Sequence, residues 1–142
     1  MKLRSRAGVT LIEMLIVMAI IGLIAGISFS SVSAGLESIQ LRSAADSIAS
    51  FLIAAQLRAD RRQQAMEVVI TPAESTLTLY SSEAGYTRKL ALENGIKIVG
   101  DQPTQFLLLP GGTAPAVAID LFNKRGAHKL VRIDPVTGVP QI

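Results

Sequence analysis

The feature that most constrains this sequence is an apolar run close to its first residue. Residues 9–27 read VTLIEMLIVMAIIGLIAGI and contain one ionisable side chain, that of Glu13. As a helix, this run would extend about 28 Å, which is close to the thickness of the hydrocarbon core of a bilayer. Three basic residues precede the run, and residues 28–36 carry no charge. The positive-inside rule therefore predicts a single span with a cytoplasmic N-terminus and the rest of the chain outside.

The basic character of the chain is concentrated in front of this run. The formal charge is +3, and Lys2, Arg4 and Arg6 account for it, because the chain without residues 1–8 has 11 basic and 11 acidic side chains. The basic isoelectric point is therefore no argument for nucleic-acid binding. The chain has no cysteine, which excludes disulfides, thiolate metal clusters and a cysteine nucleophile.

The residues around the start of the apolar run form a second pattern. A short basic leader ends in Gly8, and an apolar residue, the letters T-L-I-E and a long apolar stretch follow. This pattern resembles the signature of type IV prepilins. In that family a membrane-embedded aspartyl peptidase cuts after the glycine on the cytoplasmic side and then methylates the new amino terminus. The resemblance implies cleavage between Gly8 and Val9, with Val9, where the family usually has Phe, as the N-methylated residue.

Glu13 is an unusual residue for an apolar helix, because a carboxylate within a membrane costs a few kcal/mol unless it has a partner. Cleavage after Gly8 would create such a partner in the α-ammonium group of Val9, either on the same helix or on a neighbouring subunit. The resemblance implies that Glu13 governs subunit recruitment and register during assembly. The alternative is that Glu13 lies near the cytoplasmic interface, stays hydrated and has no such role.

A change of pattern after residue 36 predicts that the helix leaves the membrane and packs on a globular head. From residue 36 to about 66, apolar side chains recur at spacings of three and four, which is typical of an amphipathic helix; they are Leu41, Ala44, Ala45, Ile48, Phe51, Leu52 and Ala55. One helix is therefore expected from Val9 to Gln64. Its outer half should bury this stripe against the sheet that follows.

The remainder of the sequence reads as short strands separated by turns. Alternating and β-branched residues predict strands at 67–71, 76–81, 86–92, 96–99, 105–109, 117–122, 129–133 and 139–142. The short connections favour antiparallel pairing. The predicted fold class is α+β, with a long N-terminal helix packed on a mainly antiparallel β-sheet head. The predicted divisions are a leader at 1–8, a transmembrane helix at 9–29, its amphipathic continuation at 30–66 and a β-rich head at 67–142.

The order of these elements also resembles the pilin superfamily. A long helix, a series of hairpins and a D-P-x-T-G turn at 134–138 look most like the GspH/FimT-like minor pseudopilins. The resemblance implies a non-enzymatic structural subunit of the periplasmic pseudopilus of a type II secretion system. The implied partners are prepilin peptidase, other major and minor pseudopilins and the bacterial inner membrane, which the chain would cross once, with its head in the periplasm.

No pattern in the sequence predicts catalysis, a cofactor or a metal site. His128 is the single histidine, and it is expected at the surface or at a strand edge. Asp101, Asp120 and Asp134 are too far apart in the sequence for a calcium loop. The glycine pair at 110–112 lacks a P-loop lysine and a following helix, so it predicts a turn.

Two other functions remain open at this point. FimT-like minor type IV pilins bind DNA during natural transformation, and the corresponding candidates in this sequence are Lys124, Arg125, Lys129 and Arg132. A nucleic-acid partner is not expected, because the charges of the head balance and no basic residue follows Gly138.

Arg58, Arg61 and Arg62, which are interleaved with Asp60, are interpreted as a solvated helix face. The remaining alternative is a membrane-anchored β-domain with no role in a filament.

Overall fold

The structure is a computed structural model that describes residues 10–81 and 85–142, except for the side chains of residues 28–34. The predicted cleavage and methylation residues, Gly8 and Val9, lie outside the described residues. The contacts divide the chain into two compact units, Met1–Leu36 and Glu37–Ile142, and the second is called the head unit below.

Helix α1 comprises Leu11–Arg62. Thr10 caps its first turn, because the Thr10 side-chain oxygen accepts a hydrogen bond from the Glu13 N–H at 3.3 Å. At the other end, Gln63 adopts a left-handed conformation with φ of 53°, and the Gln64 N–H donates to the carbonyl of Ala59. This closing turn ends the helix at Arg62, two residues before the predicted end. The expectation of one helix that continues from the apolar run into the head is confirmed.

The first sheet of the head has four strands in the order β3-β2-β1-β5. Their bounds are Met66–Thr71 for β1, Thr76–Ser81 for β2, Thr87–Ala91 for β3 and Thr104–Leu108 for β5. A short 3₁₀ helix, η1 at Pro72–Glu74, connects β1 to β2. All three strand pairs are antiparallel.

The second sheet has the order β4-β6-β7-β8 and is also antiparallel throughout. Its strands are Lys97–Ile98 for β4, Ala118–Phe122 for β6, His128–Ile133 for β7 and Pro140–Gln141 for β8. Every predicted strand is present, with ends that differ by at most one residue. The head thus has two four-stranded sheets where the sequence predicted one, because the chain passes from the second sheet back to the first between β4 and β5.

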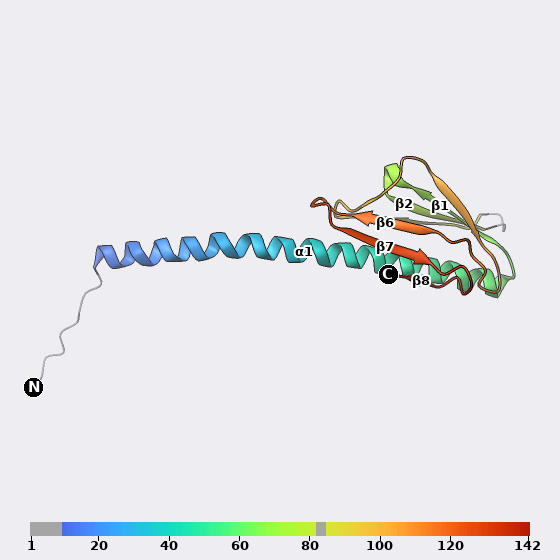
Figure 1. Cartoon of the computed structure of the whole chain (residues 1–142), viewed down its shortest axis with the longest axis horizontal. Coiled ribbons are helices and arrows are strands. Elements are labelled where there is room, and N and C mark those ends of the chain that lie inside the picture. Colours follow the sequence, from blue (N-terminus) through green and yellow to red (C-terminus); the bar gives the residue numbers. More distant parts are fainter. Residues whose placement is uncertain (1–9, 82–84) are drawn as a thin grey trace, which may run out of the picture. The chain divides into compact units, whose positions relative to one another are not determined.

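Within the head unit the strands lie beside the second half of α1 (Figure 1), and a single hydrophobic core joins α1 to both sheets. Ile48 and Leu52 of α1, Leu79 of the first sheet and Leu121 of the second are all fully buried. The buried residues of α1 are those of the predicted stripe together with Ala49, Gln56 and Ala59, except that Ala44 is only partly buried. The predicted fold class, a long helix packed on antiparallel β-structure, is confirmed.

Candidate functional site

The first turns of α1 present an apolar surface that no other part of the described chain covers. Every large apolar side chain from Leu11 to Ile27 is at least 43% exposed. Exposed apolar surface of this extent is typical of a site that contacts lipid or another protein. Among the residues whose side chains the structure describes, no helix combines the length and the apolarity needed to cross a membrane.

Glu13 lies in the first turn of α1 and is exposed. Its backbone N–H is bound by Thr10, and the Thr-x-x-Glu spacing from Thr10 to Glu13 is that of a capping box, in which the acid assists helix initiation. This bond is made by the backbone of Glu13, so it does not depend on the assembly role that the resemblance implies for the Glu13 carboxylate. The negative side chain also complements the positive end of the helix dipole.

The four basic residues that the sequence offered as DNA contacts do not form one surface. Lys124 and Arg125 lie in the turn between β6 and β7, and the Arg125 Nε atom is 3.1 Å from a carboxylate oxygen of Glu37. Lys129 and Arg132 both lie in β7, but side chains three residues apart on a strand point to opposite faces of the sheet. Lys129 is half-buried, in phase with buried Val131, whereas Arg132 is exposed.

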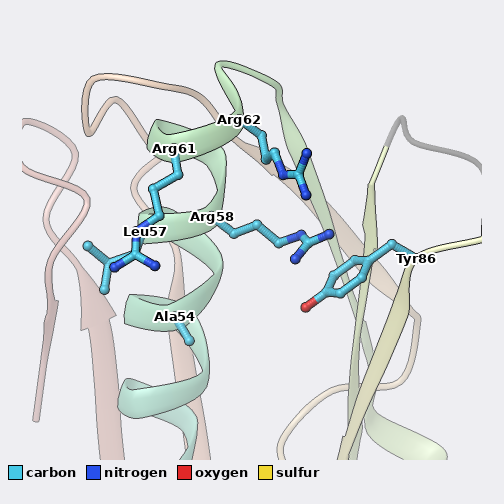
Figure 2. Close-up of a pocket in the computed structure, with 6 residues that line it drawn as sticks. All are labelled: Ala54, Leu57, Arg58, Arg61, Arg62 and Tyr86. Atoms are coloured by element: carbon cyan, nitrogen blue, oxygen red, sulfur yellow. The ribbon is translucent and has the colours of Figure 1, made fainter.

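A different group of basic side chains does come together, at the end of α1. The guanidinium carbon of Arg58 lies 3.5 Å from the centre of the Tyr86 ring, which is a close cation–π contact. Beside this pair is an open hollow of about 460 Å³, and we call it the arginine hollow; it is lined by Ala54, Leu57, Arg58, Arg61, Arg62 and Tyr86. Figure 2 shows that Arg58 and Arg62 extend toward the side of the helix where Tyr86 lies, whereas Arg61 folds toward Leu57.

The two glycine-containing turns that the sequence singled out meet at the same end of α1. The Gln56 side-chain N–H donates to the carbonyl of Leu109 at 2.8 Å, and the Gly111 N–H donates to the Asp60 carboxylate at 2.8 Å. A Cβ atom on Gly138 would lie 2.6 Å from the carbonyl oxygen of Gly112 and 3.3 Å from the Gln56 side chain. We call this arrangement the glycine junction. It requires glycine at 138 both for its φ of 66° and for the close approach.

Asp134 holds the second of these turns in shape. Its carboxylate accepts hydrogen bonds from the N–H groups of Val136 at 2.8 Å and Thr137 at 3.1 Å. These backbone donors, that of Val136 first, lower the pKa of Asp134 below its ordinary value of 3.8, because they favour the ionised form. The D-P-x-T-G pattern thus forms a turn that the Asp134 carboxylate holds in shape.

His128 is exposed at the first position of β7, as the sequence predicted. Its Nδ1 atom lies 3.0 Å from the Asp120 carboxylate, and its ring stacks on Phe122 with centres 6.0 Å apart. One histidine with one carboxylate makes an incomplete metal site. Within residues 10–81 and 85–142, no three His, Asp or Glu side chains are placed to hold a metal ion.

The sequence did not predict the pairing of Arg58 with Tyr86, of Arg125 with Glu37 or of His128 with Asp120. The first two pairs join residues that are far apart in the chain, so no local sequence pattern predicts them. The third lies within the β6–β7 hairpin, and the turn signal at 123–126 fixes the register that brings Phe122 opposite His128. The pairing of His128 could therefore have been found from the sequence.

Comparison with known proteins supports the pilin-like character of the chain. Residues 3–29 match the prokaryotic N-terminal methylation motif, which includes Gly8, Val9 and Glu13. No curated protein matches the sequence. The fold is similar to that of the minor pseudopilin EpsH from the type 2 secretion system of Vibrio cholerae, with a TM-score of 0.59 and 18% sequence identity over 72% of this chain and 94% of that chain. The chain therefore joins a methylation motif to a pilin-like fold.

Proposed function

We propose that this protein is a minor pseudopilin, a structural and non-catalytic subunit of the periplasmic pseudopilus of a type II secretion system. The observation that carries the proposal is the methylation motif at residues 3–29, followed by a head whose fold is similar to that of a minor pseudopilin. The exposed apolar surface from Leu11 to Ile27 supports it further, because a subunit of this kind needs lipid before assembly and neighbouring helices after it.

In this proposal the chain is made with residues 1–8 as a leader and is anchored in the bacterial inner membrane by one span. Prepilin peptidase cuts between Gly8 and Val9 and methylates the amino group of Val9. The N-terminus before cleavage is cytoplasmic and the head is periplasmic. Other major and minor pseudopilins then pack against α1, and Glu13 sets the register by pairing with a neighbouring amino terminus.

The proposal is tested by the intact mass of the protein purified from membranes that contain a prepilin peptidase. The expected mass lacks residues 1–8 and includes one added methyl group, and a Gly8→Val variant is expected to keep the full unmodified mass. A wild-type protein of full mass would contradict the proposal. The protein would then be a plain membrane-anchored β-domain.

The assembly role of Glu13 needs a control for its position in a capping box. Glutamine can replace glutamate in the capping box but carries no charge. Glu13→Gln and Glu13→Ala are therefore both expected to impair secretion in a strain that depends on this subunit, if the charge pairs with a neighbouring amino terminus. Normal secretion with Glu13→Gln and loss with Glu13→Ala would assign Glu13 to helix initiation instead.

A minor type IV pilin that binds DNA is the competing function. The scattered placement of Lys124, Arg125, Lys129 and Arg132 does not favour it, because one strand of nucleic acid needs a continuous basic track. Deletion of the gene for this protein, followed by measurement of both protein secretion and natural transformation, separates these functions. Loss of secretion with normal transformation supports the pseudopilin, and the reverse result supports the DNA-binding pilin.

A further inference from the structure

We propose that the arginine hollow binds an acidic segment of a partner protein, with glutamate or aspartate side chains against Arg61 and Arg62 and an apolar side chain against Leu57. The site lies in the head unit and does not require filament assembly. Its test and the test of the proposed function can therefore fail independently.

The first argument is the balance of charge around the hollow. Arg61 and Arg62 are exposed and form no ion pair with any residue in the described part of the chain. The one acidic residue of this helix turn, Asp60, is occupied elsewhere, because it accepts hydrogen bonds from the Gly111 N–H and, at 3.3 Å, from the Gln56 side chain. The described surface of the hollow is therefore positive and complements an acidic partner.

The second argument is the geometry of the lining. The Tyr86 ring holds the Arg58 guanidinium in place at 3.5 Å, so this wall of the hollow is ordered before a ligand arrives. Planar guanidinium groups match the two oxygens of a carboxylate. The helix dipole accounts for cations in the last turn of α1, but not for the stacking of Arg58 on the ring of Tyr86, which directly precedes β3.

The third argument is the apolar part of the lining. Leu57 is 50% exposed next to Arg61 (Figure 2), and Ala54, one turn earlier on α1, also lines the hollow. A site with both features fits a short peptide in which acidic and apolar side chains alternate. Phosphate or another small anion would leave Leu57 uncovered.

A polypeptide fits the hollow better than a nucleic acid does. Arg88 of β3 also lies near α1, with its guanidinium carbon 5.6 Å from the centre of the Phe51 ring, and the acidic Asp46 lines the same depression as Arg88. The basic side chains along α1 beyond the hollow are therefore interrupted by an acidic one. Its one aromatic side chain, Tyr86, is covered by Arg58 and does not offer a free face there for a base.

The experiment measures peptide binding by the full chain in a nonionic detergent, with fluorescence anisotropy as the readout. The probe is a fluorescein-labelled peptide in which glutamate and leucine alternate, and the matched probe has glutamine in place of every glutamate. The test variant is Arg61→Gln with Arg62→Gln. The control variant is Arg42→Gln with Lys97→Gln, which removes the same charge from two exposed positions outside the hollow.

The acidic probe is expected to bind and the glutamine probe is not. The test variant should weaken binding about tenfold, because it removes charges that touch the peptide. The control variant should weaken binding about twofold at most, because salt screens charges that lie far from the peptide. No binding of the acidic probe at low salt, or an equal loss in both variants, would overturn the proposal. Tighter binding of a labelled oligonucleotide that also depends on Arg61 and Arg62 would assign the hollow to nucleic acid and overturn it as well.

Discussion

The substitution Gly138→Ala measures how tightly the glycine junction is packed. Gly138 has a φ of 66°, and an alanine in this left-handed region costs about 1 kcal/mol. Its Cβ atom would also lie 2.6 Å from the carbonyl oxygen of Gly112, so one of the two turns must move. Overpacking of this kind adds about 1–3 kcal/mol. We therefore expect Gly138→Ala to lower the free energy of unfolding by about 2–4 kcal/mol in total.

Gly126 offers a matched control for the backbone cost alone. Its φ is 77°, and a Cβ atom there would meet nothing within 4 Å. Gly126→Ala should therefore cost only the left-handed conformation, about 1 kcal/mol. The difference between the two variants isolates the contact between the turns.

The assay is urea unfolding of the full chain in detergent, followed by tyrosine fluorescence. Both tyrosines of the chain, Tyr80 and Tyr86, lie in the head unit, and there is no tryptophan, so the signal reports on the head. The free energy of unfolding should fall with urea concentration at the same slope in the two variants and the wild type, and the three proteins should differ in the urea concentration at which half of the protein is unfolded. Equal losses of stability in Gly138→Ala and Gly126→Ala would refute the close packing of the two turns.

Three further variants test other contacts of the head by the same unfolding assay. Asp134→Asn should lower stability at neutral pH, and the difference from the wild type should shrink as the pH falls below 3.8, since the depressed pKa of Asp134 stabilises the fold only while the carboxylate is ionised. Gln56→Ala should cost about 1 kcal/mol because the Leu109 carbonyl loses its donor, and an unchanged midpoint would contradict this. Arg125→Ala should cost less than about 1 kcal/mol, because the pair with Glu37 is partly exposed, and a larger loss would mean that Arg125 has a second structural role.

The elements of the fold could be predicted from local patterns. The apolar stripe from Leu41 to Ala55 has the period of a helix, and the strands alternate with the period of a sheet. These signals depend only on neighbouring residues, so the predicted and observed bounds of the strands agree to within one residue. The division into two sheets could not be predicted, because it depends on whether β5 pairs with β4 or with β1, far back in the chain.

The contrast between local patterns and long-range contacts also explains why the sequence predicted the positions of the basic residues less well than the elements of the fold. Lys129 and Arg132 were grouped because they are close in sequence, although the alternation of a strand already separates them. The arginines of α1 were interpreted as a solvated face because Asp60 stands among them. The structure turns Asp60 toward Gly111 and brings Tyr86 to Arg58, and both contacts join residues that are distant in the sequence.

Polar contacts at both ends of the head fix its register on α1. Glu37 pairs with Arg125 at one end, and Gln56 and Asp60 bind main-chain groups of the glycine junction at the other. The buried stripe between them also resists a shift along the helix, because a shift by one turn would place Ser47 or Ala55 in the buried position of Phe51. Such a shift would break the contacts at both ends. The head therefore cannot slide along α1 without loss of these bonds, and the arginine hollow keeps a fixed position at the end of the helix.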